Sequence, residues 1–254
     1  MATHPALDWL NNYGLRWWMP FDASWSYGDS VFIMDPWLWV LLAAPWLLSR
    51  RRGGGLLLGW TVFFALIGWV VGARSPSFLP VVAAVALLLL AAWAIPPERL
   101  GRWRERLPVL GLLAAMLWIG TLLGLHRVAV ARARAGLAAA GVAGVDRLMV
   151  GPTALDPGRW EVVAALPGEY RWGRLSLWPA DRGLSLAPEN LVRPPAARLA
   201  ELSADDRVRD FLVWARFPWV WEEPGGPVVL DARYARTVRP GFGATRGRRP
   251  SGRP

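Results

Sequence analysis

The chain of 254 residues carries a formal net charge of +10 and is 54% hydrophobic, a larger apolar share than a soluble domain normally has. All of its basic residues are arginines, scattered without a homeodomain, zinc-finger or ribonucleoprotein pattern, so we expect no nucleic-acid partner. The absence of cysteine excludes disulfides, thiolate metal sites and a cysteine nucleophile.

Residues 1–30 are expected to form an interfacial segment, which opens with the run THPALDWLNNYG. His4 and Asp8 are four positions apart, so on a helix both side chains project from one face and could hold one metal ion. The alternative is a surface histidine beside an aspartate, which helices show routinely. We predict His4 and Asp8 as metal ligands, and two ligands are too few for a tight site.

Four apolar stretches follow, each close to the roughly 20 residues that cross a bilayer. They are Val31–Leu48, Leu56–Ala73, Phe78–Ile95 and Pro108–Leu125. One such stretch could be a buried core helix, but four in succession predict an α-helical integral membrane protein with about four transmembrane helices over residues 31–125.

Asp35 lies within the first apolar stretch, where an ionisable group is costly and by default suggests function. The more favoured interpretation is that Asp35 caps the helix, with Pro36 at its first position. The two roles are compatible, and Asp35 is our candidate catalytic residue.

Basic residues in short loops stay on the cytoplasmic side of a membrane. The first and third loops between the spans hold seven arginines and the second holds only Arg74; the seven are Arg50, Arg51, Arg52, Arg99, Arg102, Arg104 and Arg106. This asymmetry places the N-terminal motif and everything after Leu125 on the outer face. Arginines soon after the fourth span, such as Arg127, act against this orientation.

The composition changes after the fourth span. Residues 126–149, rich in Ala and Arg, predict a connecting helix that leaves the membrane. Short β-type runs broken by Pro and Gly then predict a small β-rich extramembrane C-terminal domain over residues 150–240. The runs are RWEVVAAL, EYRWGRLSLW, FLVWARFPWVW and PVVLDARYA.

Two smaller features complete the chain. Asp231 and Arg233 end a strand-like run, where they could bind a ligand or pair with each other. Residues 241–254 have too few apolar groups to fold and are expected to be disordered.

The runs THPALDWLNNYGLRWWMPF, VFIMDPWLW, FLVWARFPWVW and VVLDARYA resemble the bacterial membrane-bound metal-dependent hydrolases, also called LexA-binding inner-membrane-associated hydrolases. The resemblance implies that His4 and Asp8 match a metal-ligand motif of that family and Asp35 its Asp-Pro. It also implies an inner-membrane location and a divalent metal ion: zinc first, then manganese or iron.

The chain departs from the family at its start, because family members carry an upstream histidine-rich motif on an earlier membrane helix. We expect either a start codon assigned too late or an N-terminally shortened relative that lacks half of the site. A site of His4, Asp8 and Asp35 alone leaves hydrolysis in doubt, because catalytic metal sites need about three protein ligands and an open position.

Two functions remain open. The first is a membrane hydrolase in which a metal-activated water attacks an ester, phosphoester or amide of unknown identity at the outer face. The second is a non-enzymatic membrane protein whose C-terminal domain binds a partner protein or an envelope component. In either function we expect the protein to lie in the lipid bilayer.

Overall fold

The computed structural model describes residues 3–33, 35–50, 101–236 and 244–246, with short helical pieces at 58–59, 61–62, 65 and 86–87. The second and third expected spans, 56–73 and 78–95, therefore lie almost entirely outside the described residues. The chain forms two compact units: Met1–Ser30 together with Leu125–Pro254, and Val31–Gly124.

The second unit contains helix α2, Pro36–Arg50, in the region of the first expected span. The helix begins five residues later than the apolar stretch does, because Asp35 accepts hydrogen bonds from the backbone N–H groups of Trp37 and Leu38. This is an N-cap with proline at the first helical position. At fifteen residues, α2 is shorter than the roughly 20 that a straight crossing needs.

Helix α6, Trp103–Ala139, is the one helix among the described residues that is long and apolar enough to cross a membrane. We expected a span at 108–125 and a separate connecting helix at 126–149, but one uninterrupted helix covers most of both ranges. The segment is dominated by Leu, Ala and Arg, which favour continued helix. Over 109–117 its exposed side chains are large and apolar, among them Val109, Leu112, Met116 and Leu117.

Helices α2 and α6 contact each other within the second unit. The Arg104 Nε donates to the Ser49 carbonyl at 2.7 Å, and the Trp118 indole donates to Asp35 Oδ2 at 3.2 Å. Between these contacts, a Cβ at Gly111 would lie 2.6 Å from the Leu41 carbonyl oxygen. Glycine at this position therefore lets the two helices approach closely.

The first unit contains an antiparallel sheet in the order β1-β2-β3-β4, with β5 also paired to β3. Its strands are β1 Arg147–Pro152, β2 Arg159–Leu166, β3 Glu169–Ser176, β4 Gly183–Leu186 and β5 Leu191–Val192. A single 3₁₀ turn, Pro179–Asp181, precedes β4. The expected run RWEVVAAL is thus a strand, and so are the first eight residues of the expected run EYRWGRLSLW. The first strand begins at Arg147, just before the expected start of the domain at residue 150.

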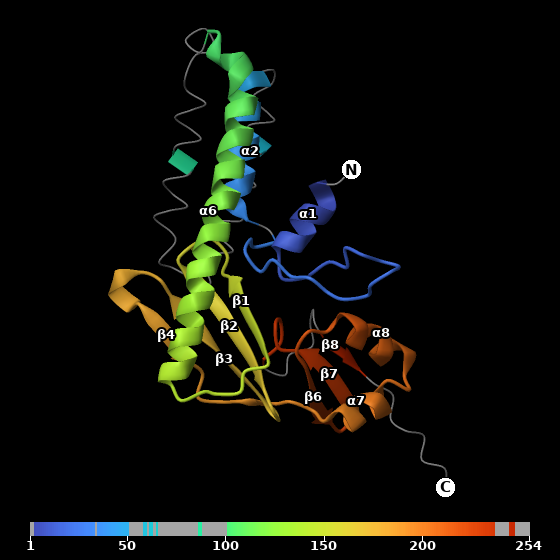
Figure 1. Cartoon of the computed structure of the whole chain (residues 1–254). Coiled ribbons are helices and arrows are strands. Elements are labelled where there is room, and N and C mark those ends of the chain that lie inside the picture. Colours follow the sequence, from blue (N-terminus) through green and yellow to red (C-terminus); the bar gives the residue numbers. More distant parts are fainter. Residues whose placement is uncertain are drawn as a thin grey trace. The chain divides into compact units, whose positions relative to one another are not determined.

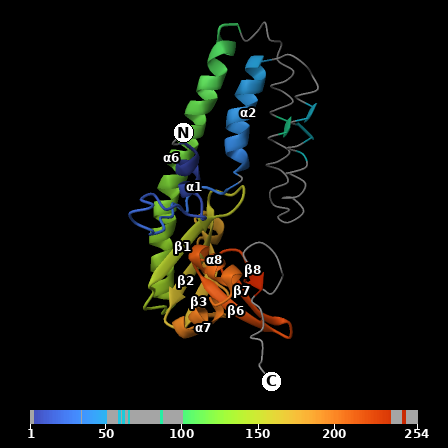
Figure 2. The same cartoon turned by 90° about the vertical axis from the view of Figure 1, so that its right-hand side faces the viewer.

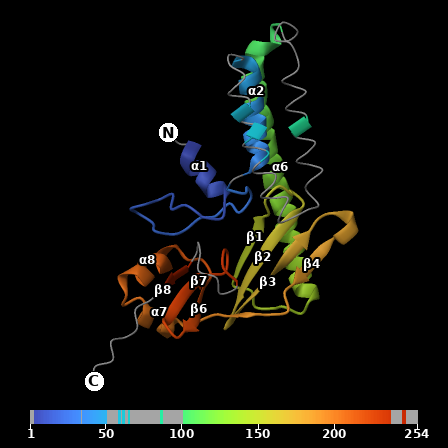
Figure 3. The ribbon, with the colours of Figure 1, turned by 180° about the vertical axis from the view of Figure 1, so that it is seen from behind.

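A second sheet has the order β6-β7-β8 and carries two helices (Figure 3). Its elements are α7 Ala196–Leu202, α8 Asp206–Trp214, β6 Pro218–Glu223, β7 Gly226–Asp231 and β8 Ala244–Arg246. Strands β6 and β7 form a hairpin whose turn lies at Pro224 and Gly225, in one of the Pro- and Gly-containing breaks between the expected β-type runs.

The core of the first unit consists of alternating strand positions. Val163 and Ala165 of β2 face the second sheet, where they pack with Leu230, whereas Val162 packs against Ala129 and Ala133 of α6. On the far side of the second sheet, Val229 packs against α7 and α8. The order of layers is therefore the end of α6, the first sheet, the second sheet, and α7 with α8 (Figures 1 and 2).

Two expectations about the C-terminal domain are corrected. The run FLVWARFPWVW is not one strand: its first four residues end α8 and only its end enters β6, because Pro218 cannot continue a helix. Residues 244–246, expected within a disordered tail, pair as β8 with Val228–Leu230. The open edge of β7 offers backbone donors and acceptors that even a polar segment can use.

Candidate functional site: the opening helix and the arginine cluster that holds it

The predicted metal ligands lie on helix α1, Thr3–Leu10. The His4 Nδ1 atom is 3.6 Å from Asp8 Oδ2, and the two side chains are 86% and 44% exposed. The helical spacing therefore brings both donors to one accessible face, as predicted. The described part of the chain contains no group of three or more His, Cys, Asp or Glu side chains that could hold a metal ion.

The geometry of the pair can be compared with the requirements of a metal ion. Two ligands held at about 2.1 Å from one tetrahedral ion lie roughly 3.4 Å apart, close to the observed separation. His4 and Asp8 thus fit two positions of a coordination shell, and their exposure leaves room for water and substrate. At least one further ligand is required for a catalytic zinc site.

Asp35 belongs to the other unit, Val31–Gly124, and its side chain is buried. Its Oδ1 accepts the Trp37 and Leu38 amides at 2.8 and 3.1 Å, and its Oδ2 accepts the Trp118 indole N–H. The capping role that the sequence favoured is therefore what Asp35 performs. A role for Asp35 in catalysis stays a prediction.

Helix α1 is held by the segment that returns beneath its C-terminal end. The Trp9 indole donates to the Ser26 hydroxyl at 2.8 Å, the Gly28 amide donates to the Trp9 carbonyl at 2.7 Å, and the Ser30 amide donates to the Leu10 carbonyl at 2.8 Å. A Cβ at Gly28 would lie 2.6 Å from the Trp9 carbonyl oxygen. The close approach of these two stretches of backbone therefore requires glycine at position 28.

The same segment is anchored to the C-terminal domain by a buried ion pair. The Arg216 NH1 group donates to both oxygens of Asp29, at 2.7 and 2.9 Å, and both side chains are buried. The Arg216 guanidinium also lies 4.0 Å from the centre of the Tyr27 ring and donates to the Leu148 carbonyl. One arginine thus joins the segment after α1 to the strand β1.

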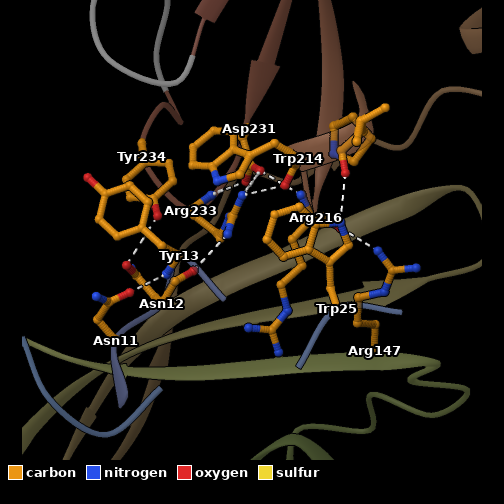
Figure 4. Close-up of polar contacts among 12 residues, drawn as sticks. Asn11, Asn12, Tyr13, Trp25, Arg147, Trp214, Arg216, Asp231, Arg233 and Tyr234 are labelled. Carbon is orange, nitrogen blue, oxygen red and sulfur yellow. Dashed lines mark hydrogen bonds and ion pairs between the residues drawn. The ribbon is translucent and has the colours of Figure 1, made fainter. Parts of the chain in front are cut away.

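A second arginine holds the residues that follow α1 directly. Arg233 is paired with Asp231 at 2.8 Å, with both side chains fully buried, and its NH1 donates to the Asn12 carbonyl at 2.7 Å. The Tyr234 hydroxyl donates to the Asn12 side-chain oxygen at 3.1 Å. The rings of Tyr234 and Trp214 stack with their centres 5.4 Å apart, and the Arg233 guanidinium lies 4.3 Å from the Trp214 ring (Figure 4).

Asp231 connects the two arginines. One of its oxygens accepts the Arg216 backbone amide at 2.7 Å and the Arg233 Nε at 3.0 Å. Of the two roles left open for Asp231 and Arg233, the structure shows the internal pair. We call the set Asp29, Arg216, Asp231 and Arg233 the arginine cluster.

Burial governs the titration of the groups around this cluster. It raises the pKa of the Asp29 carboxyl, and the nearby Arg216 guanidinium opposes that rise. It also raises the pKa values of the Tyr27 and Tyr234 phenols, again against the effect of Arg233. The phenols of Tyr27 and Tyr234 therefore remain neutral at physiological pH and act as ring and hydrogen-bond partners.

Two residues of the arginine cluster were missed by sequence reasoning, namely Asp29 and Arg216. Asp29 stands in a polar segment without a motif, and its partner is 187 positions away. Arg216 was visible only as part of the run Trp-Ala-Arg-Phe-Pro. The structure shows what the opening, Trp-Ala-Arg and Asp-x-Arg-Tyr runs share: all three meet at this cluster.

Comparison with known protein families gives a match on the N-terminal part of the chain. Residues 1–77 match the model of the family described as YdjM inner membrane protein. The matched range contains His4, Asp8, Asp29 and Asp35 but not the C-terminal domain. No curated protein and no solved structure matches the chain. The match over residues 1–77 is therefore to the YdjM inner membrane protein family, the membrane-bound metal-dependent hydrolase family that the opening motif resembles.

Proposed function

We propose that the protein is a membrane-bound hydrolase that holds a divalent metal ion with His4 and Asp8 and cleaves an ester, phosphoester or amide bond. The observation that carries this proposal is the exposed pair of donors, 3.6 Å apart, within the part of the chain that matches the family. Zinc is the first choice of metal because imidazole nitrogen and carboxylate oxygen both suit it, with manganese or iron as alternatives.

A bound divalent ion would lower the pKa of a water molecule and polarise the bond to be cleaved. The chain's own contribution is to fix the direction of α1. Ser26, Gly28 and Ser30 hold the helix end, and Arg216 and Arg233 hold the residues around it. Asp35 is proposed as a proton acceptor or a further ligand, a role in addition to its cap of α2.

We also propose that the protein is a multi-pass protein of the bacterial inner membrane, with α1 and the C-terminal domain on the outer face. Residues 1–30 and 125–236 hydrogen-bond to each other within one unit, which supports the proposal that both lie on one side of the bilayer. An even number of crossings must then lie between residues 31 and 124. Four crossings satisfy this condition, and the arginine counts in the loops favour the outer side.

The test is metal retention by the full-length protein purified in detergent. We expect His4→Ala and Asp8→Ala each to lose the bound metal, measured by elemental analysis. Asp206→Ala is the matched control, because Asp206 is also an exposed helical carboxylate, paired with Arg209 three positions on. Wild-type metal content in both His4→Ala and Asp8→Ala would rule out the proposed ligands.

A second function, a non-enzymatic membrane protein whose C-terminal domain binds a partner, is favoured by one observation. The described residues place no third metal ligand beside His4 and Asp8. A folded wild-type protein that retains no zinc, manganese or iron would support this second function over the hydrolase.

A further inference from the structure

The segment between α1 and α2 contains a loop whose two ends are hydrogen-bonded to each other. Leu15 and Ser26 form an isolated antiparallel bridge, in which each backbone amide donates to the other residue's carbonyl, at 2.8 and 2.9 Å. At the far end, the amides of Phe21 and Asp22 both donate to the Trp18 carbonyl. Residues 16–25 thus form a loop with a fixed base and a turn at its tip, drawn in blue after α1 in Figure 1.

The tip of this loop exposes four large apolar side chains. Trp18 is 69% exposed and Phe21 is 94% exposed, and Trp17 and Met19 are also exposed. The arms of the loop are polar or paired instead: the Asp22 carboxylate accepts from the Ser24 amide and hydroxyl, and the Arg16 guanidinium lies 4.5 Å from the Trp25 ring. The exposed apolar side chains are therefore gathered at the tip of the loop, and the arms are polar. Such an exposed apolar patch is typical of a surface that a binding partner covers.

We propose that this tip, Trp17 to Phe21, inserts into the interfacial region of the bilayer in which the protein resides. Tryptophan concentrates at the boundary between headgroups and acyl chains, where its ring is buried and its N–H stays hydrated. Phenylalanine and methionine beside it add apolar surface that enters the acyl region. The polar arms and Arg16 are suited to the headgroup layer.

Two features favour lipid over a protein partner. The tip presents four side chains on one turn, whereas a stable protein interface buries about 800 Å² on each partner. The tip is also close in sequence to an apolar helix, because Phe21 precedes the first residue of α2 by only fifteen positions. Insertion of the tip sets α1 close to the membrane surface, since the rings of Trp17 and Trp9 lie 6.4 Å apart.

The absence of cysteine from the chain permits a direct test. Phe21→Cys in the full-length protein is labelled with an environment-sensitive fluorophore and reconstituted into phosphatidylcholine and phosphatidylglycerol vesicles that contain spin-labelled lipids. Val192→Cys is the matched control, because Val192 is an exposed apolar residue of strand β5. Trp18→Cys provides a second probe on the tip.

We expect blue-shifted emission and strong quenching by spin-labelled lipid for the probes at positions 21 and 18, with neither effect at position 192. Quenching at position 21 by aqueous iodide but not by lipid would overturn the proposal, because the tip would then lie in water. Shielding from both quenchers would overturn it too, since the tip would then be covered by protein.

Discussion

Arg216 is the residue on which the link between the N-terminal segment and the C-terminal domain most depends. It neutralises the buried Asp29 carboxylate with two hydrogen bonds. We expect Arg216→Met to lower the free energy of unfolding by about 3–5 kcal/mol, because it leaves a buried charge without a partner. Chemical unfolding of the full-length protein in detergent measures this loss.

A matched control for Arg216 is Arg198, whose side chain pairs with Glu201 and Glu222 at the surface. Arg198→Met should cost less than about 1 kcal/mol, because exposed ion pairs contribute little. The double variant Asp29→Asn with Arg216→Met should recover part of the loss, since it removes the unpaired charge. Equal losses for Arg216→Met and Arg198→Met would contradict the role of the buried pair.

Tyr170 gives the protein a specific sensitivity to alkaline pH. Burial raises the pKa of its phenol to about 12, and the hydroxyl donates to the Pro218 carbonyl at 2.9 Å. The unfolded chain ionises near pH 10, so stability from the neutral phenol is present below pH 10 and is lost as the pH rises toward 12. The loss attributable to Tyr170 amounts to roughly 2–3 kcal/mol.

We expect Tyr170→Phe to flatten the fall in stability between pH 10 and pH 12, at a cost of about 1 kcal/mol at neutral pH from the lost hydrogen bond. Unfolding curves of the full-length protein across this range test it. Some pH dependence of the stability should remain in Tyr170→Phe, because burial raises the pKa of Tyr234 as well. A slope unchanged by Tyr170→Phe would show that other groups control the alkaline transition.

At the scale of elements, the packing of α6 on the first sheet depends on Gly136. A Cβ at this position would lie 2.6 Å from the Leu184 Cβ on β4. Gly136→Ala should destabilise the protein by about 1–3 kcal/mol, because the overpacking outweighs the better helix propensity of alanine.

Gly120 is the control on the same helix, since a Cβ there meets nothing within 4 Å. Gly120→Ala should be neutral or stabilising by up to about 1 kcal/mol. Thermal unfolding of both variants in the same detergent separates the effect of overpacking from the effect of helix propensity. Equal stabilities of Gly136→Ala and Gly120→Ala would contradict the close contact between α6 and β4.

The elements that sequence patterns predicted best are those with local signals. The short β-type runs RWEVVAAL and EYRWGRLSLW mark β2 and β3 close to their observed positions, and the Pro and Gly residues between runs mark the β6–β7 hairpin. Helix α8 was missed because Phe211, Val213 and Trp214 favour strands by composition. Its signals were present, since Asp205 is an N-cap whose side chain accepts the Arg207 amide.

The candidate site was predictable only where its residues are close in sequence. His4 and Asp8 are brought together by one helical turn, and Asp35 caps the helix that follows it. The arginine cluster joins Asp29 to Arg216 and Asn12 to Arg233, across pairings set by the tertiary fold. No periodicity in a single sequence reports such long-range pairs.

At the scale of the whole molecule, the shared unit of residues 1–30 and the C-terminal domain makes a topological prediction. Single cysteines at the exposed positions Ala23 and Ala204 should be labelled by an impermeant maleimide from the same side of the membrane, the outer one in intact cells. A cysteine at Gly54, in the arginine-rich loop, should be protected. Labelling of Ala23→Cys and Ala204→Cys from opposite sides would contradict an even number of crossings.

The hydrolase proposal rests on metal binding by His4 and Asp8, so the most direct measurement is the X-ray absorption spectrum of the zinc-loaded full-length protein. Wild type and Asp206→Ala should show imidazole-nitrogen scattering, and His4→Ala should lose it. A spectrum that is the same in wild type and His4→Ala, or a wild-type protein that retains no metal, would contradict the proposal.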